Sequence, residues 1–475
     1  MNSTERQIYL LNPREYSPEI IAVAFAKTSR SPESFRDIAS DLNDEKSADF
    51  HEKWVVGYGH SSVAEHAVLH MAFENVSRLA VETIESNRLA SYTEKSTRYQ
   101  KWTAGAYYTP FEVTQTGLEK EYRKLTGMLF ETYARSLELC KVIVQGENPR
   151  KVEETEAIWE RRIRSEYVDV CRFLLPAASL ANLGMTANAR VLEGMIRKML
   201  SHPLDEVRAI GSQVKKVAVK EVPTLLKYAD AMPYLVDTPA LLSMDAQSVG
   251  LKAGRSSDWC TLLNWQPDGE DELIAAALFR FSGGSYEDAL SRVKQFSPEQ
   301  KQQVFEHLLG GLGKFDTPLR ELEHITYTFA IVMDQGGYFE VKRHRMMTQT
   351  VQPLTSRLGY TIPVKVMQAG FYDDYCRAMD SVCEGYQRLE PALAEAVSYL
   401  IPNAFNRRVL LSMNFREAFN FCALRSASNA HFSVRRVARR VAEEIQKVHP
   451  MLGRYIQVSA DETWQSVERD YFLQV

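Results

Sequence analysis

The chain has 475 residues, of which 45% are hydrophobic and 25% charged, and its formal net charge is -4. These values are ordinary for a globular protein, and so small a net charge gives no whole-chain reason to expect a nucleic acid or a membrane as partner. No apolar run approaches the roughly 18 residues that a membrane span needs, and the N-terminus lacks the apolar core of a secretory signal. We therefore expect a cytoplasmic protein with two or more domains.

The first half contains one predicted strand and three predicted helices. The strand is the run VLHMAF at 68–73, which is short and apolar. The helices have apolar residues at three- and four-residue spacing and cover 116–146, 150–172 and 203–229. After them, residues 230–247 lose this periodicity and contain two prolines, which predicts a boundary between domains.

The second half repeats this succession of elements. The run ITYTFAIVM at 325–333 predicts a strand, and helices are expected near 374–399, 414–425 and 432–448. No Gly-x-Gly-x-x-Gly follows a strand and no P-loop is present, so a bound phosphate would have to be held by side chains.

The two halves also share landmark residues in the same order. The matching pairs are Glu65 and Glu323, Arg88 and Arg345, Pro176 and Pro402, Asn188 and Asn414, and Pro223 and Pro450. The intervals from Glu to Arg, from Pro to Asn and from Asn to the last Pro agree to within one residue between the two halves. We infer a tandem duplication and predict an α+β fold: two copies, 1–235 and 236–475, of a helix-rich unit with a small, mainly antiparallel sheet.

Six cysteines are scattered along the chain without a Cys-x-x-Cys pair. None lies in a Gly-rich or basic segment that would mark a nucleophile. Buried thiols in a reducing compartment are favoured over a redox or metal role.

The densest polar group is Arg343-His344-Arg345, at the end of a predicted element. Arginine offers a fixed fork of donors to phosphate, so three such residues suit a diphosphate or the edge of a flavin. A solvated turn is the alternative. The first half keeps only the last arginine of the triplet, as Arg88.

A second polar group is the segment Gly59 to His66, which contains two histidines and Glu65. Its His-x-x-x-x-Glu-His spacing does not place two ligands on one helical face, so we predict no metal. Ser62 and Glu65 have the spacing of a capping box at a helix start. Further along, Ser91, Glu94, Ser96 and Arg98 alternate as in a loop around a phosphorylated ligand, which alone is a weak signal.

Four polar residues, Asn414, Arg416, Asn420 and Arg425, punctuate a predicted helix of the second half. The first and last fall on nearly the same face. We expect the amides, Asn420 included, and the guanidinium groups on the apolar side of the helix, where polar groups are costly unless they meet a ligand or a partner chain. The run Arg435 to Arg440 is interpreted instead as a solvated helix face.

These residues resemble the motifs of the flavin-dependent thymidylate synthases. That family carries G-H-x-S-x-x-E-H, then R-H-R-x-x-S-x-N-E-Q-S-x-R-Y, then A-R-x-x-L-P and N-x-R-x-x-x-N-x-x-x-x-R. The first half matches at Gly59, His60, Ser62, Glu65, His66, Arg88, Ser91, Glu94, Ser96, Arg98, Tyr99, Arg172, Pro176, Asn188 and Arg190. The second half matches at Glu323, His324, Arg343, His344, Arg345, Asn414, Arg416, Asn420 and Arg425.

The departures from the motifs are largely complementary. The first half lacks the first two residues of R-H-R, and it has Gly194 and Met199 in place of the later Asn and the final Arg. The second half lacks G-H-x-S, has Val351 for the loop Glu, and has Ser398 for the Arg of A-R-x-x-L-P. Since family members build each site from several subunits of a tetramer, the resemblance implies a homodimer that forms a pseudo-tetramer with fewer than four complete sites.

The resemblance also implies roles for the matching residues. Substrate binding falls to Glu94, Ser96, Arg98, Arg172 and Arg425, and FAD binding to Ser62, Glu65, Glu94, Arg343, His344, Arg345, Asn414, Arg416 and Asn420. Arg425 is assigned to the uracil, where a cation favours the ionised ring and raises the nucleophilicity of C5.

The implied reaction is reductive methylation of deoxyuridylate at C5, with methylenetetrahydrofolate as carbon donor and NADPH as reductant of FAD. Family members use no cysteine nucleophile. Two alternatives stay open: an FAD-binding relative that acts on another pyrimidine nucleotide, and a non-catalytic protein with a role in assembly or regulation.

Overall fold

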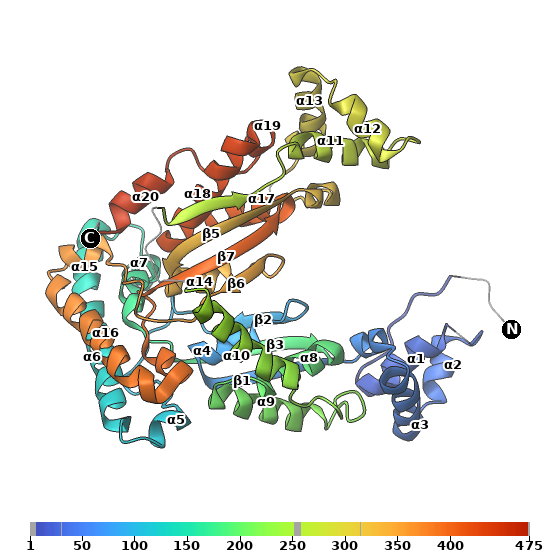
Figure 1. Ribbon diagram of the computed structural model, residues 1–475, viewed down its shortest axis with the longest axis horizontal. Helices are drawn as coiled ribbons and strands as arrows, with labels where there is room; N and C mark the ends of the chain where they lie inside the picture. Colours follow the sequence, from blue (N-terminus) through green and yellow to red (C-terminus); the bar gives the residue numbers. More distant parts are fainter. Residues whose placement is uncertain (1–5, 30, 251–257, 314, 474–475) are drawn as a thin grey trace. The chain divides into compact units, whose positions relative to one another are not determined.

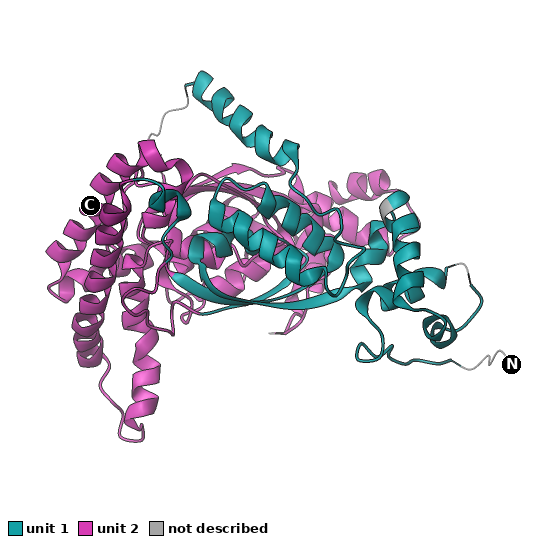
Figure 2. Cartoon of the chain, turned by 90° about the horizontal axis from the view of Figure 1, so that it is seen from below, with its two compact units in different colours: residues 1–95, 108–116, 180–252 teal, residues 96–107, 117–179, 253–475 magenta. Residues whose placement is uncertain are grey.

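The computed structural model describes residues 6–29, 31–250, 258–313 and 315–473. The chain forms two compact units (Figure 2). Unit 1 contains residues 1–95, 108–116 and 180–252, and unit 2 contains residues 96–107, 117–179 and 253–475. Unit 2 therefore combines much of the first half of the chain with nearly all of the second. The predicted boundary at 235 separates the two sequence copies, not the two compact units, and it stays a prediction.

Unit 1 is built around a three-stranded antiparallel sheet with the order β1-β3-β2 (Figure 1). Its strands are β1 (Val68–Ser77), β2 (Ser91–Glu94) and β3 (Leu180–Asn188). Its helices are α1 (Pro18–Lys27), α2 (Phe35–Ser40), α3 (Asp44–Phe50), α4 (Arg78–Ile84), α5 (Phe111–Thr114), α8 (Ala189–Leu200), α9 (Asp205–Ala218) and α10 (Pro233–Ser248), with the short turns η1 (His51–Gly57) and η2 (Ser61–His66).

Unit 2 contains a four-stranded antiparallel sheet with the order β4-β5-β7-β6. Its strands are β4 (Cys260–Asn264), β5 (Thr326–Asp334), β6 (Thr348–Val351) and β7 (Asn406–Asn414). Its helices are α6 (Glu119–Glu147), α7 (Glu156–Cys171), α11 (Gly269–Arg280), α12 (Tyr286–Val293), α13 (Pro298–Phe305), α14 (Gln335–Val341), α15 (Val364–Gln368), α16 (Tyr372–Leu393), α17 (Phe415–Arg425), α18 (Phe432–Val448), α19 (Pro450–Gly453) and α20 (Trp464–Tyr471), with the turns η3 (Arg172–Leu174), η4 (Glu306–Gly310), η5 (Arg320–His324) and η6 (Ala394–Leu400).

The two sheets repeat one pairing scheme, which confirms the predicted α+β fold with small antiparallel sheets. Val68 pairs with Asn188 in one sheet, and Thr326 pairs with Asn414 in the other. Each asparagine then caps the helix that follows its strand, because its Oδ1 accepts the amide N–H three residues on, at 2.9 Å in both copies. Among the described residues of unit 1 no strand corresponds to β4, and the sequence did not indicate β4.

Most predicted helices were placed correctly to within a few residues, and two predictions were wrong. The helix expected over 203–229 ends at Ala218. The segment 230–247, expected to break helical structure, contains α10. Pro233 occupies the first helical turn, where its missing N–H costs nothing, and no residue of α10 is buried, so the helix shows no apolar periodicity.

The core of unit 2 lies between its sheet and helices α17 and α18 (Figure 1). Alternate residues of β5, namely Tyr327, Phe329, Ile331 and Met333, point into it and are fully or almost fully buried. A buried side chain of this size contributes about 1.5–3 kcal/mol to stability.

Segments from the two halves of the chain also pair directly within unit 2. The Ala178 amide donates to the Tyr399 carbonyl at 2.8 Å, and the Asn403 amide donates to the Leu175 carbonyl at 3.0 Å. Pro176 and Pro402, which are equivalent residues of the two copies, form an antiparallel bridge with each other. The copies thus meet through corresponding residues, as subunits do across a two-fold axis.

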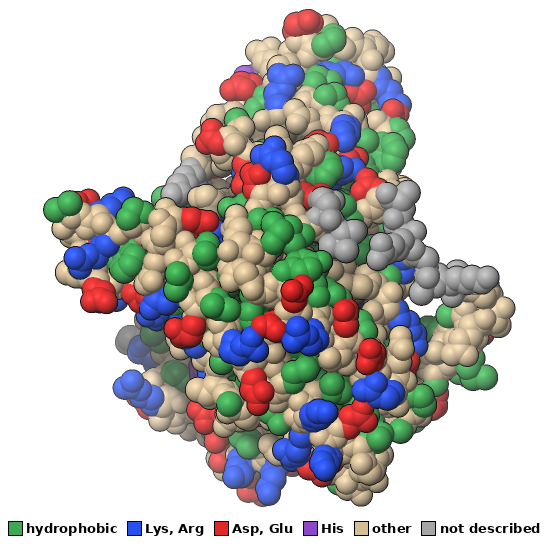
Figure 3. Space-filling view, turned by 90° about the vertical axis from the view of Figure 1, so that its left-hand side faces the viewer, with side chains coloured by type: hydrophobic (Ala, Val, Ile, Leu, Met, Phe, Trp, Pro, Cys, Tyr) green, Lys and Arg blue, Asp and Glu red, His purple; other side chains and the backbone are tan. Residues whose placement is uncertain are grey.

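The surface charge and the apolar character of the helices are what the composition led us to expect. On the face shown in Figure 3, acidic and basic side chains are interspersed and form no single-sign patch. Within the described parts of the chain, no helix has the length and apolar character required to cross a membrane.

Candidate active site

Four arginines that the sequence predicted for the site gather in unit 2 with two carboxylates, and we call this group the arginine cluster. It consists of Arg98, Arg172, Arg343, Arg425, Asp169 and Glu340. Arg98 lies in the loop after β2, and Arg172 begins the turn after α7. Glu340 lies in the last turn of α14, Arg343 lies just after this helix, and Arg425 is the last residue of α17. The first half of the chain therefore supplies two of the arginines, and the second half supplies the other two.

Arg98 is held by a bidentate pair with Asp169. Its Nε and Nη2 donate to the carboxylate at 2.9 and 2.7 Å, and its Nη1 donates to the Asn429 carbonyl at 3.0 Å. Burial raises the pKa of Asp169, and its hydrogen bond from Arg98 opposes that shift. Such a fork fixes the guanidinium in one orientation.

Arg172 is almost completely buried, at 2% exposure. Its Nη1 donates to the Thr97 hydroxyl at 3.1 Å and lies 3.7 Å from Glu340, and its Nη2 donates to the Gly336 carbonyl at 3.2 Å. Burial lowers the pKa of Arg172, and Asp169 and Glu340 counteract the shift.

Glu340 is the carboxylate at the centre of the cluster, and the sequence did not single it out. It lies 3.1 Å from Arg425 Nη1 and 4.0 Å from Arg343 Nε. Burial alone would raise the pKa of Glu340, but Arg343, Arg172 and Arg425 lower it to about 2. The carboxylate is therefore ionised at neutral pH.

His344 connects Arg425 to Glu417. Arg425 Nε donates to His344 Nε2 at 2.9 Å, so this ring nitrogen is an acceptor. His344 Nδ1 then carries the proton, which it donates to Glu417 Oε1 at 2.9 Å. The buried ring also meets Phe421 edge to face. These contacts fix both the tautomer of His344 and the orientation of Arg425.

The family model described as "Thymidylate synthase complementing protein" matches residues 13–224 and 261–451. The chain belongs to this family. One match falls in each half, as expected for two diverged copies, and the resemblance drawn from the sequence motifs is confirmed.

Curated relatives match either most of this chain or about half of it. A UPF0159 protein of Chlamydia muridarum is 29% identical over 435 residues, which cover 87% of this chain and 82% of the relative. A UPF0159 protein of Thermoplasma acidophilum is 25% identical over 452 residues, covering 86% and 88%. A flavin-dependent thymidylate synthase of Clostridium tetani is 28% identical over 218 residues, covering 45% and 82%.

Two solved structures are also similar to this chain. One is the flavin-dependent thymidylate synthase of Helicobacter pylori complexed with FAD and dUMP, with a TM-score of 0.33, 16% identity, and coverage of 42% of this chain and 100% of that chain. The other is the UMP/dUMP methylase PolB of Streptomyces cacaoi, with a TM-score of 0.34, 17% identity, and coverage of 42% and 95%.

Other family residues of unit 2 have partners of their own. Asn414 caps α17, Arg416 Nη1 pairs with Glu323 at 2.6 Å, and the Ser96 hydroxyl accepts the Arg98 amide at 3.2 Å. Asn420 is exposed, and Leu424 is exposed beside it. Placing Asn420 on the apolar side of the helix was therefore wrong.

The family residues of unit 1 also form ion pairs. Glu94 pairs with Arg78, and both side chains are buried. Glu65 pairs with Arg190, which repeats the Glu323–Arg416 pair of the other copy. Residues 61–66 form a 3₁₀ turn without a side-chain cap, so the predicted capping box at Ser62 is wrong. The ligand roles of these residues stay predictions.

The expectation of a solvated face for Arg435 to Arg440 is also wrong. Arg435 and Arg439 each place Nε 2.9 Å from Glu462, and Arg440 pairs with Asp258 at 2.6 Å. The segment leading into α20 covers this face of α18, and local periodicity cannot reveal a cover that comes from elsewhere in the chain.

The cysteines and the possible metal ligands were also considered as parts of the site. Cys140, Cys171, Cys260 and Cys422 are buried free thiols. Among the residues that the structure describes, no group of three or more His, Cys, Asp or Glu side chains could hold a metal ion.

Proposed function

We propose that the chain is a flavin-dependent methyltransferase that methylates C5 of a pyrimidine nucleotide, with deoxyuridylate as substrate and methylenetetrahydrofolate as carbon donor. The arginine cluster carries this proposal. Each half of the chain lacks family residues, and the cluster combines Arg98 and Arg172 of one half with Arg343 and Arg425 of the other. The names of relatives such as the Clostridium tetani enzyme support the same reaction.

The charge of the cluster suits a phosphate monoester. Four arginines face two carboxylates, Asp169 and Glu340, which leaves an excess of two positive charges. A monoester dianion would offset this excess, and buried charge is tolerated only when it is paired. Arg343, with 43% of its side chain exposed, is the member best able to contact an incoming ligand.

The residues after α14 fit the FAD that the proposal requires. Arg343 is exposed and Arg345 is half-buried, so a diphosphate could reach both guanidinium groups, and arginine suits phosphate oxygens. FAD, reduced by NADPH, would supply the hydride that the methylation consumes. In this proposal His344 orients Arg425 through the Glu417–His344–Arg425 contacts.

Arg425 would act on the pyrimidine ring. Its Nε and Nη1 are bound to His344 and Glu340, so the guanidinium is held in place before substrate arrives. A fixed donor at a ring carbonyl or at N3 stabilises negative charge on the ring and makes C5 more nucleophilic. The chain would work as a cytoplasmic homodimer that forms a pseudo-tetramer.

One observation favours a second candidate, a different pyrimidine nucleotide. Glu340 presents an ionised acceptor beside the Arg425 donors. A carboxylate accepts well from the amino group of cytosine and opposes an ionised uracil. Cytidine monophosphates should therefore be assayed alongside deoxyuridylate.

Purified full-length protein reconstituted with FAD tests the proposal. The protein should be yellow, NADPH oxidation should require deoxyuridylate, and mass spectrometry should detect the 5-methyl product. Methylation of a cytidine monophosphate alone would support the second candidate. A protein that neither binds FAD nor methylates any pyrimidine nucleotide would refute both and favour a non-catalytic role.

A further inference from the structure

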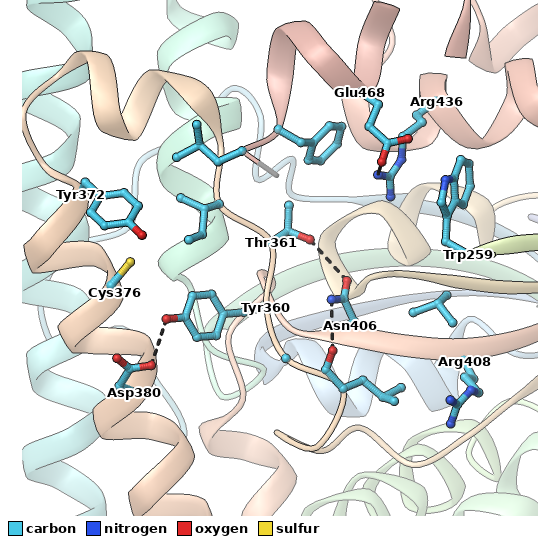
Figure 4. Close-up of a pocket in the computed structure, with 16 residues that line it drawn as sticks. Trp259, Tyr360, Thr361, Tyr372, Cys376, Asp380, Asn406, Arg408, Arg436 and Glu468 are labelled. Carbon is cyan, nitrogen blue, oxygen red and sulfur yellow. Dashed lines mark hydrogen bonds and ion pairs between the residues drawn. The ribbon is translucent and has the colours of Figure 1, made fainter. Parts of the chain in front are cut away.

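A cavity of about 550 Å³ in unit 2 is lined partly by polar residues that bind one another. The Tyr360 hydroxyl donates to Asp380 at 2.9 Å, and the Thr361 hydroxyl donates to Asn406 at 3.3 Å (Figure 4). These hydrogen bonds are made without a ligand. A requirement that one chain does not meet lies instead on α10 of unit 1, whose apolar side chains are exposed to water.

Helix α10 exposes apolar side chains in several directions. No residue of the helix is buried, and Tyr234, Leu241, Leu242 and Met244 are each at least 60% exposed. Neighbouring residues of a helix point in different directions, so these side chains do not form a single stripe that could face one core. A helix that is apolar on all sides is normally buried, which indicates that something covers α10 in solution.

The second copy shows how the segment after the last landmark proline can be held in place. After Pro450 the chain returns over α18 and forms α20, and Arg436 and Arg439 of α18 lie 3.8 and 2.9 Å from carboxylates of this segment. In the register of the landmark prolines, the corresponding residues of α9 are Ala209 and Ser212. These residues carry no charge, so α10 is not held on α9 in the way that α20 is held on α18.

The charges of α10 argue against a nucleic acid or an anionic membrane as its partner. The helix contains Asp237 and Asp245 and no lysine or arginine. Binding to phosphates and to anionic lipid surfaces depends on lysine and arginine. The partner that fits is therefore the surface of a protein.

The amount of exposed apolar surface fits a contact between two chains. Together with Val236, which is 50% exposed, the four apolar residues named above present roughly 600 Å², the upper end of the range for the largest patch on a typical monomer. A standard interface buries about 800 Å² per partner, so α10 can supply most of one side.

We propose that α10 is a dimer contact, in which the helix packs against α10 of a second copy of this chain across a two-fold axis. Each helix then covers the apolar side chains of the other, because a two-fold contact is self-complementary. The aspartates of the two helices repel each other, so the dimer should tighten as salt screens them. The contact specifies the interface of the homodimer in the proposed function, and it does not depend on methylation.

Sedimentation velocity of the full-length protein tests this contact. The parent should be a dimer, and Leu242→Glu should raise its dissociation constant by about tenfold or more, because a charge replaces an apolar side chain in the contact. Val152→Glu is the matched control, because Val152 is fully exposed outside α10 and its replacement should leave the constant within about twofold. Circular dichroism confirms that both variants are folded.

Oxidative cross-linking distinguishes a second copy from any other cover. Leu242 lies near the middle of α10, so Leu242→Cys should form a disulfide between two chains, seen as a dimer on a non-reducing gel. Ser212→Cys, at an exposed position of α9, should not, and the parent, with Cys376 and Cys383 partly exposed, gives the background.

Three results would overturn the proposal. They are a monomeric parent, a dimer that Leu242→Glu leaves as stable as before, and a Leu242→Cys variant that forms no more cross-linked dimer than Ser212→Cys. Each would mean that another part of the chain or a different protein covers α10. Because none of these measurements involves the reaction, they are independent of whether the chain methylates a nucleotide.

Discussion

Replacing Glu340 by glutamine should destabilise the protein, and the effect should depend on pH. The surrounding arginines depress the pKa of Glu340 from 4.5 to about 2, although burial acts in the opposite direction. A depression of this size corresponds to about 3 kcal/mol of stability from the ionised carboxylate at neutral pH. Removing the charge also leaves Arg172 and Arg425 without their central counter-ion.

The sign of the pH dependence follows from the lowered pKa. The carboxylate stabilises the folded state above its unfolded pKa of 4.5, and this contribution is lost as the pH falls toward about 2. At pH 7, Glu340→Gln should lower the Tm by about 5–10 °C. By pH 3 the difference from the parent should be less than half as large.

Thermal unfolding followed by circular dichroism at pH 7, 5 and 3 measures this difference. Glu395→Gln is the matched control, because Glu395 is exposed and the same change there should shift the Tm by less than 2 °C or so. A Tm difference for Glu340→Gln that stays constant between pH 7 and pH 3 would refute the electrostatic reasoning, as would no difference at pH 7.

Three further substitutions have separate expected outcomes. Arg425→Ala should reduce methylation at least ~100-fold with flavin retained, measured by product formation and flavin absorbance, and unchanged turnover would contradict its role on the ring. His344→Gln should reduce kcat about tenfold or more without loss of flavin, because the ring contacts Arg425 and Glu417; loss of flavin would instead support the flavin-binding role implied by the family. Phe329→Ala should cost about 3–5 kcal/mol, since its side chain is fully buried in the core of unit 2, and denaturant unfolding measures this.

Local patterns in the sequence predicted several of the helices and one strand of each sheet. The helices α6, α7, α16, α17 and α18 follow apolar periodicity, and β1 and β5 follow short apolar runs. The repeated landmarks predicted two similar sheets. Helix α10 was missed because no face of it is buried, and an unburied helix has no apolar stripe to reveal it.

Site residues that belong to a sequence motif could be predicted. Residues whose role depends on partners far away in the sequence could not. Arg98 and Arg425 were noted from the residue pattern, Arg172 was implied by the family resemblance, and the structure brings the three together. Glu340 was missed because two of the three arginines around it, Arg172 and Arg425, lie far from it in sequence. The burial of Arg436 depends in the same way on α20 and Trp259.

The bridge between Pro176 and Pro402 has a consequence for how the two copies diverge. In a symmetric dimer, every substitution near the axis appears twice, so a change that suits one side is imposed on the other. Joining the copies in one chain removes this constraint, because each position across the bridge is encoded separately. One copy keeps Arg172 while its counterpart has become Ser398, whose hydroxyl now donates to the Leu354 carbonyl at 2.8 Å. In the fused chain, one side of the interface can therefore keep a family residue while the corresponding position on the other side changes.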